Sequence, residues 1–188
     1  MGGVTAEGLV LVGPDNRRFW SLFSASPEAQ DGAPDPIDRW SRRILRTLAE
    51  ELSAEALFPF GGPPWHPFIG WALEADHITQ SPIGLLVSQE AGLWVSFRGA
   101  LRFEGSVEAR AAEPPCPACP APCTTACPVG AFGGGAYDVE TCRAHVRSPA
   151  GSACRDGGCL ARHACPVGAD FAPPPAQAHH HMGSFLGE

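Results

Sequence analysis

The cysteines constrain this chain more than any other feature. All eight lie between positions 116 and 165 of a 188-residue chain. The phrase Ala-Cys-Pro-Val-Gly-Ala occurs twice among them, at Ala126–Ala131 and at Ala164–Ala169. A duplicated set of four cysteines that ends in Cys-Pro is typical of iron–sulfur sites, because a cubane cluster needs four soft thiolates around one small body. The pattern therefore predicts a metal-binding module built from two halves.

Two other chemistries use cysteines in number. Disulfides suit small secreted proteins, but Met1–Ser26 has no basic start followed by a long apolar core, so we expect no secretory signal. Structural zinc uses Cys-x2-Cys pairs, and only Cys116 and Cys119 are spaced in this way. Both alternatives stay open beside the iron–sulfur interpretation, which we favour.

The spacing over residues 115–172 resembles that of bacterial two-[4Fe-4S] ferredoxins. The first half has one extra residue between Cys119 and Cys123, and the second half is less regular, with eleven residues between Cys142 and Cys154. The resemblance implies that the cysteine before each proline serves the cluster built by the opposite half, and that a short strand lies at Tyr137–Cys142. Cluster one would then bind Cys116, Cys119, Cys123 and Cys165. Cluster two would bind Cys127, Cys142, Cys154 and Cys159.

Composition limits the partners and the compartment. A net charge of −7 and a pI near 5.4 argue against nucleic acid or an anionic membrane as a partner. The longest apolar runs fall short of the roughly 20 residues that a membrane span needs, so we expect a cytoplasmic protein with no membrane partner. A hydrophobic content of 44% is enough for a core. The expected partner is a redox protein, and the oligomeric state is left open.

The remaining patterns predict an α+β fold. Before the cysteines we expect a strand at 8–13, helices at 17–25, 35–53 and 68–75, a loop at 27–36, an edge strand at 56–60, and a hairpin of 81–88 with 93–103. The long helix repeats Ile37, Trp40, Ile44, Leu48 and Leu52 on one apolar face. The predicted regions are an α+β N-terminal region at 1–110, a ferredoxin-like cysteine module at 111–172, and a C-terminal docking tail at 173–188. That tail would dock through Met182, Phe185 and Leu186.

Two groups of side chains outside the cysteines are candidates for function. The long helix carries four arginines, which either form a solvated face or contact an acidic partner or a cofactor phosphate; they are Arg39, Arg42, Arg43 and Arg46. The proline-rich loop at 60–68 carries Trp65, His66 and Phe68, and such a loop either fills a core or lines a pocket. His66 is either a packed, hydrogen-bonded residue or a ligand and proton carrier.

A second resemblance covers residues 35–104. The phrase from Gly84 to Leu101 is similar to the hairpin of corrinoid-processing proteins with a reduced nitroreductase-like fold, and to the segment before the ferredoxin module in epoxyqueuosine reductases and reductive dehalogenases. The resemblance implies a place for a corrinoid or flavin between the 65–68 loop and the hairpin.

These observations lead to three functional hypotheses. We expect an electron-transfer protein with two [4Fe-4S] clusters, a carrier or accessory redox partner without catalytic residues. The alternative is an enzyme, an iron–sulfur reductase that uses a corrinoid or flavin in the N-terminal region. The third is a structural cysteine module without iron.

Overall fold

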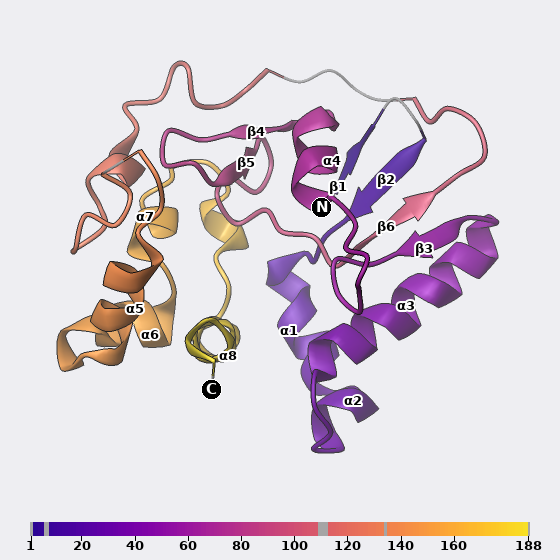
Figure 1. Cartoon of the computed structure of the whole chain (residues 1–188), viewed down its shortest axis with the longest axis horizontal. Coiled ribbons are helices and arrows are strands. Elements are labelled where there is room, and N and C mark those ends of the chain that lie inside the picture. Colours follow the sequence, from indigo (N-terminus) through magenta and orange to yellow (C-terminus); the bar gives the residue numbers. More distant parts are fainter. Residues whose placement is uncertain (1, 6–7, 109–112, 134, 188) are drawn as a thin grey trace. The chain divides into compact units, whose positions relative to one another are not determined.

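The chain divides into two compact units (Figure 1). The computed structural model describes residues 2–5, 8–108, 113–133 and 135–187. The first unit comprises Met1–Thr79 with Val95–Glu113, and the second comprises Gln80–Trp94 with Pro114–Glu188. The mixed α+β class is as expected. Residues 80–94, which the sequence places in the N-terminal region, group with the cysteine-rich segment instead, and the expected boundary at 110–111 lies outside the described residues.

A four-stranded antiparallel sheet is the base of the first unit. Its order is β1 (Gly2–Val4), β2 (Leu9–Val12), β6 (Gly99–Arg102) and β3 (Glu55–Leu57). Leu9 and Leu11 of β2 are buried, as alternation along a half-buried strand requires. In the register, Leu11 of β2 and Leu57 of β3 both pair with Ala100 of β6. The strand at 8–13 and the edge strand after the long helix are therefore confirmed.

Four helices are found among the described residues of the first unit: α1 (Asn16–Ser24), α2 (Pro27–Gln30), α3 (Pro36–Leu52) and α4 (Phe68–Glu74). The helix α3 has Pro36 in its first turn and ends at Ser53, whose left-handed conformation brings its N–H to the carbonyls of Ala49 and Glu50. The helices expected at 17–25, 35–53 and 68–75 are confirmed to within two residues. The short helix α2 lies where the sequence predicts a loop.

The buried face of α3 differs from the predicted one. Ile37, Ser41, Leu45 and Ala49 are buried, whereas Ile44 and Leu52 are 39% and 47% exposed. Ser41 tolerates burial because its hydroxyl donates to the Ile37 carbonyl at 2.7 Å and accepts from Nε of Arg98 at 3.1 Å. Two hydrogen bonds thus allow a serine on the face where the pattern calls for an apolar side chain.

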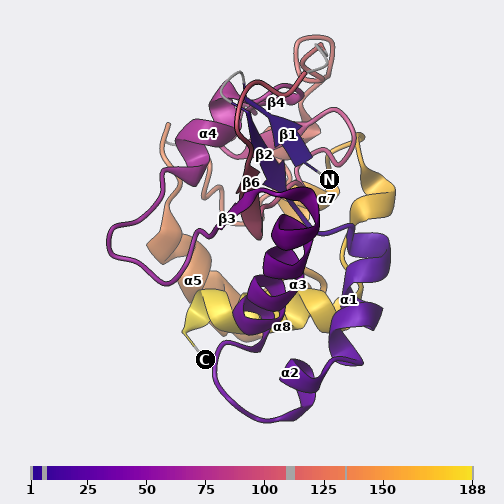
Figure 2. The same cartoon turned by 90° about the vertical axis from the view of Figure 1, so that its right-hand side faces the viewer.

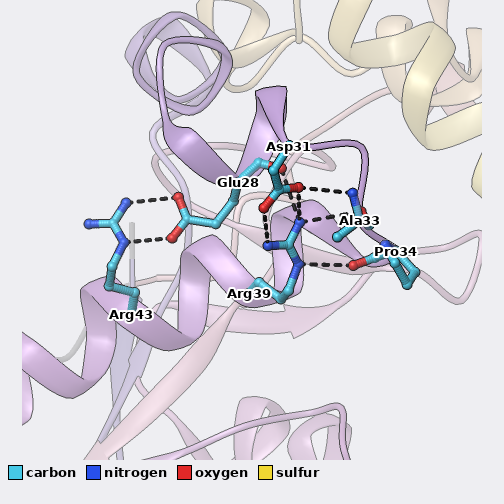
Figure 3. A network of polar contacts seen from close by, with 6 residues as sticks. All are labelled: Glu28, Asp31, Ala33, Pro34, Arg39 and Arg43. Atoms are coloured by element: carbon cyan, nitrogen blue, oxygen red, sulfur yellow. Dashed lines mark hydrogen bonds and ion pairs between the residues drawn. The ribbon is translucent and has the colours of Figure 1, made fainter.

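Three of the four helix arginines bind groups of the first unit. Figure 3 shows the guanidinium of Arg39 on the carboxylate of Asp31 at 2.7 Å and on the Pro34 carbonyl at 3.0 Å, and Arg43 on Glu28 at 2.6 Å. Arg42 lies over the ring of Phe60, 5.2 Å from its centroid. The contacts of Arg39 and Arg43 tie α2 and the following loop to α3. From the sequence, we expect these arginines either to form a solvated face or to contact an acidic partner or a cofactor phosphate.

The second unit is made of short helices and turns. The chain enters it through β4 (Ile78–Gln80), which pairs with β5 (Leu86–Ser88). After residue 113 the helices are α5 (Val139–Arg147), α6 (Ser152–Gly157), α7 (Leu160–His163) and α8 (Pro175–Leu186), with single turns η1 (Pro122–Thr124), η2 (Pro149–Gly151) and η3 (Ala169–Phe171). The strand expected at Tyr137–Cys142 is wrong. Asp138 accepts the Thr141 N–H at 2.9 Å and starts α5 at Val139 instead.

The C-terminal tail docks on the second unit as expected. Leu186 is buried with Val146 and Cys154, and Met182 and Phe185 pack against the same cluster. Two arginines of α5 hold the end of α8: Nε of Arg143 donates to the Phe185 carbonyl at 3.2 Å, and Nη2 of Arg147 to the Leu186 carbonyl at 2.9 Å. Figure 2 shows α8 beside α5.

The predicted hairpin of 81–88 with 93–103 is wrong. β5 pairs with β4, β6 pairs with β2 and β3, and a single bridge joins Ser88 to Gly92. The chain passes between the two units after Trp94. Leu93 and Trp94 are therefore buried in the second unit and Val95 in the first. The apolar run that predicts a strand reflects burial in two separate cores.

Within the described residues, every helix is too short or too polar to cross a lipid bilayer.

Candidate functional site

The eight cysteines, all of them described, are free thiols, of which Cys123 and Cys154 are buried. Among the described His, Cys, Asp and Glu residues, no three are placed to hold one metal ion. Around a single ion with bonds of about 2.3 Å, the sulfurs lie about 3.8 Å apart, whereas thiolates on a cubane lie roughly 6–7 Å apart. Four thiols that are spaced to bind a cubane are therefore too far apart to bind a single metal ion.

Four thiols form what we name the first sulfur group: Cys116, Cys119, Cys123 and Cys165. All four line one small hollow, together with Val87 and Leu93. Burial raises the pKa of Cys116, and the thiols of Cys165 and Cys119 raise it further. The pKa of Cys123 is raised by burial first and by the same neighbours. Charge on Cys119 or Cys165 is thus felt at both Cys116 and Cys123.

The other four thiols form the second sulfur group: Cys127, Cys142, Cys154 and Cys159. Burial raises the pKa of Cys142, and the hydrogen bond from Tyr137 lowers it. The thiols of Cys159 and Cys127 raise it further. Burial likewise raises the pKa of Cys154, which also feels Cys159, Cys142 and Cys127. The cysteine of each Cys-Pro pair therefore lies with three cysteines of the opposite half, so the grouping is crossed.

Short elements bring these distant thiols together. Cys123 lies in η1, Cys142 in α5 and Cys154 in α6. The helix α7 links the two groups, because Cys159 is its N-cap and the Cys165 N–H donates to the Arg162 carbonyl near its end at 3.1 Å. Ala161, in the middle of α7, is fully buried in a core that also contacts cysteines of both groups.

Hydrogen-bond donors point at the sulfurs of both groups. In the first group the Ala121 N–H donates to Sγ of Cys119 at 3.4 Å, and Cys123 is stabilised by its own backbone. In the second group the Ala131 N–H donates to Sγ of Cys127 at 3.3 Å, and the Leu160 backbone makes a hydrogen bond with the Cys154 sulfur. Such donors stabilise negative sulfur. An all-thiol donor set with N–H groups aimed at it fits an iron–sulfur cluster.

The second Cys-Pro loop lies directly against the turn at 88–92. Gly168 has φ +69°, and a Cβ there would come within 2.2 Å of the Ala91 carbonyl carbon. A Cβ on Gly92 would come within 1.9 Å of the Val167 carbonyl oxygen and 3.1 Å from Sγ of Cys165. The segment Gln80–Trp94 therefore forms one wall of the first sulfur group. The sequence signal for this contact is the glycine at the fifth position of the duplicated phrase.

Two neighbours of the second group were not identified from the sequence. Tyr137, the single tyrosine of the chain, donates its hydroxyl to the Cys142 sulfur. Arg162 of α7 is half-buried, with its guanidinium 5.9 Å from the centroid of the Trp94 ring. A tyrosine five positions before a cysteine is the one available signal. Arg162 has none, because its position depends on how α7 packs.

The first unit has a cavity of its own, of about 370 Å³. Phe19, Trp40, Ile44 and Leu45 line it together with Arg98, which pairs with Asp38. The aromatic loop is not part of this lining. Of that loop, Phe68 is buried, whereas Trp65 is 64% exposed and His66 is exposed and stacks on Trp71. Trp65 and His66 therefore neither fill a core nor line this cavity.

Comparison with known protein families, with curated proteins and with solved structures finds no match.

Proposed function

We propose that this protein transfers electrons through two [4Fe-4S] clusters, as a carrier or accessory partner of another redox protein. The observation that supports the proposal is the crossed grouping of eight free thiols into two sets of four. This grouping is the one that the resemblance to two-cluster ferredoxins implies. The module would be ferredoxin-like in its ligand order, although its second half folds as helices.

The chain's own residues suit that role. The first sulfur group would hold one cluster and the second sulfur group the other. When bound, such clusters supply reversible one-electron storage. Burial raises the pKa of four of the thiols, two in each group, so these residues favour the protonated thiol in the absence of iron and release protons when iron binds. The backbone N–H groups would then stabilise the negative sulfurs.

The iron content of the full chain tests the proposal. Anaerobic reconstitution should give about eight iron and eight sulfide per chain with a broad visible absorption shoulder. A corrinoid or flavin in the first unit, the alternative proposal, would add sharper bands to that spectrum. Colourless protein with bound zinc, or wild-type protein with about four iron after careful reconstitution, contradicts two clusters.

Cysteine pairs test the crossing. Cys123→Ala and Cys165→Ala should each lose about four iron, and the double variant should lose no more, because both thiols serve one cluster. The matched control is Cys123→Ala with Cys127→Ala, which should lose about eight. The opposite result, with Cys123 and Cys127 losing the same four iron, contradicts the crossed ligand sets.

A further inference from the structure

We propose that Tyr137 and Arg162 make the second sulfur group the more readily reduced of the two sites. The inference rests on the proposed function and adds a direction to it. An electron given to this chain by a one-electron donor protein would come to rest at the Cys127, Cys142, Cys154 and Cys159 site, before a one-electron acceptor takes it.

Tyr137 places a hydroxyl on the second sulfur group. Its ring stacks on Phe132, with centroids 4.8 Å apart and planes at 15°. The Asp138 N–H donates to the Ala131 carbonyl at 2.8 Å, which holds this segment to the first Cys-Pro loop. From there the hydroxyl donates to the Cys142 sulfur. Tyr137 is 37% exposed as a residue, and burial followed by the contact with Cys142 raises the pKa of its hydroxyl.

Arg162 places a positive charge beside the same group. It lies three residues after Cys159 on α7, its guanidinium rests over Trp94, and it interacts electrostatically with Cys159 and Tyr137. Burial lowers the pKa of Arg162 from its ordinary value, but a guanidinium remains protonated at neutral pH. A cation held in a partly desolvated position acts more strongly on its neighbours than one in water.

The first sulfur group has no equivalent pair of side chains among the described residues, because the buried hydroxyl of Ser81, which lines its hollow, makes no hydrogen bond. The pKa values of Cys116 and Cys123 are shifted by burial and by the neighbouring thiols, and that of Cys123 also by its own backbone. The hollow it lines is bounded by Val87, Leu93 and three prolines, at 82, 122 and 166, which lack an N–H to donate. Backbone donors are matched between the groups, so the difference lies in the two side chains.

The negative charge of Asp138 opposes the effects of Tyr137 and Arg162 on the second sulfur group. The Asp138 carboxylate acts on Cys142 in the unfavourable direction, but it is the weakest of the influences on that thiol, after burial, Tyr137 and the two neighbouring thiols. Reduction adds one negative charge to a site. A donated hydrogen bond and a nearby cation both stabilise the added charge and raise the potential.

A redox titration of the reconstituted full chain tests the inference, with dithionite as reductant and dye mediators, followed by electron paramagnetic resonance. Two reduction steps are expected. Tyr137→Phe removes only the hydroxyl and should make the more positive step about tenfold less favourable, about 59 mV for one electron. Arg162→Gln should shift the same step by a similar factor, and Arg162→Lys, which keeps the charge, should restore most of it.

The matched control is Arg143→Gln. Arg143 is next to Cys142 in sequence, but its guanidinium lies over the Phe185 ring at 5.1 Å and bonds the Phe185 carbonyl. Neither step should shift by more than about twofold, since this guanidinium is engaged by Phe185 and a charge that is partly screened by solvent contributes little.

The outcomes separate the inference from the function it rests on. Failure to bind iron in the wild type overturns the proposed function. With about eight iron bound, a shift confined to the more positive step supports the inference. A shift of the more negative step, or no shift in either Tyr137→Phe or Arg162→Gln, overturns it. If Tyr137→Phe binds less iron, the Arg162→Gln and Arg162→Lys pair decides.

Discussion

Each of the two units of this chain is stabilised internally, and the interactions differ between them. In the first unit, leucines of β2, β3 and α3 form an apolar core under a sheet, and ion pairs fasten the helices around it. In the second unit, the elements are short, and cysteines occupy positions in its cores, where Cys123 and Cys154 are themselves buried. The first unit is therefore stabilised by buried surface, and under the proposed function the second unit would also depend on the clusters bound by its sulfurs.

Removing iron should give the largest contrast. Without metal the thiols of each group lose the bonds that fix them, so amide hydrogen exchange from η1 to α7 should rise by about 100-fold or more. Exchange in β2 and α3 of the same full chain should change by less than about threefold. Mass spectrometry of the exchanged peptides, with and without reconstitution, gives the answer. An equal response in both units contradicts the contrast.

A core substitution should perturb the first unit alone. Leu11 is 0% exposed, so Leu11→Ala should cost about 2–5 kcal/mol. The control Leu22→Ala, at a residue 57% exposed, should cost less than about 0.5 kcal/mol. Urea unfolding followed by exchange in α3, with iron absorption recorded in parallel, separates the units. Early loss of the iron absorption in Leu11→Ala would show that the two units unfold together.

The two copies of the repeated phrase allow a matched test within the second unit. Gly130 and Gly168 have φ of +63° and +69°, so alanine is strained by about 1–2 kcal/mol at either one. A Cβ at Gly168 meets the Ala91 backbone, whereas one at Gly130 meets open space. Gly168→Ala should therefore cost about 1–3 kcal/mol more than Gly130→Ala, measured by urea unfolding of the iron-loaded protein. Equal costs would contradict packing of this loop on the 88–92 turn.

The smallest expected effect is a pH dependence of the first unit. The hydrogen bond from Arg43 lowers the pKa of Glu28 from 4.5 to about 2. A carboxyl whose pKa is depressed in the folded state adds stability above its unfolded pKa, and that stability is lost as pH falls through the folded value. Glu28→Gln should therefore flatten the fall in unfolding free energy between about pH 4.5 and about pH 2. Glu50→Gln, at an exposed position of α3, controls for loss of a carboxylate. An unchanged slope in Glu28→Gln would contradict the pair.

Local signals predicted the helices best. Pro36 and Ser53 mark the ends of α3, because a proline in the first turn and a left-handed terminal residue act within one turn of the chain. The buried side of α3 was less predictable, since Ser41 depends on Arg98, which is 57 residues away. The hairpin failed for a related reason: alternation records which residues are buried, and it does not record in which core.

Sequence alone located the cysteines, their duplicated order and the two ends of α3, since each of these depends on residues a few positions apart. It implied the crossed sulfur groups only through a resemblance. The contacts of Gly168 with Ala91, of Tyr137 with Cys142 and of Arg162 with Trp94 depended on tertiary packing. These contacts join segments that are distant in sequence, and the hydrophobic periodicity of a segment does not record which other segment it packs against. Steric fit between two backbones and desolvation of a charge arise only once the segments are packed together.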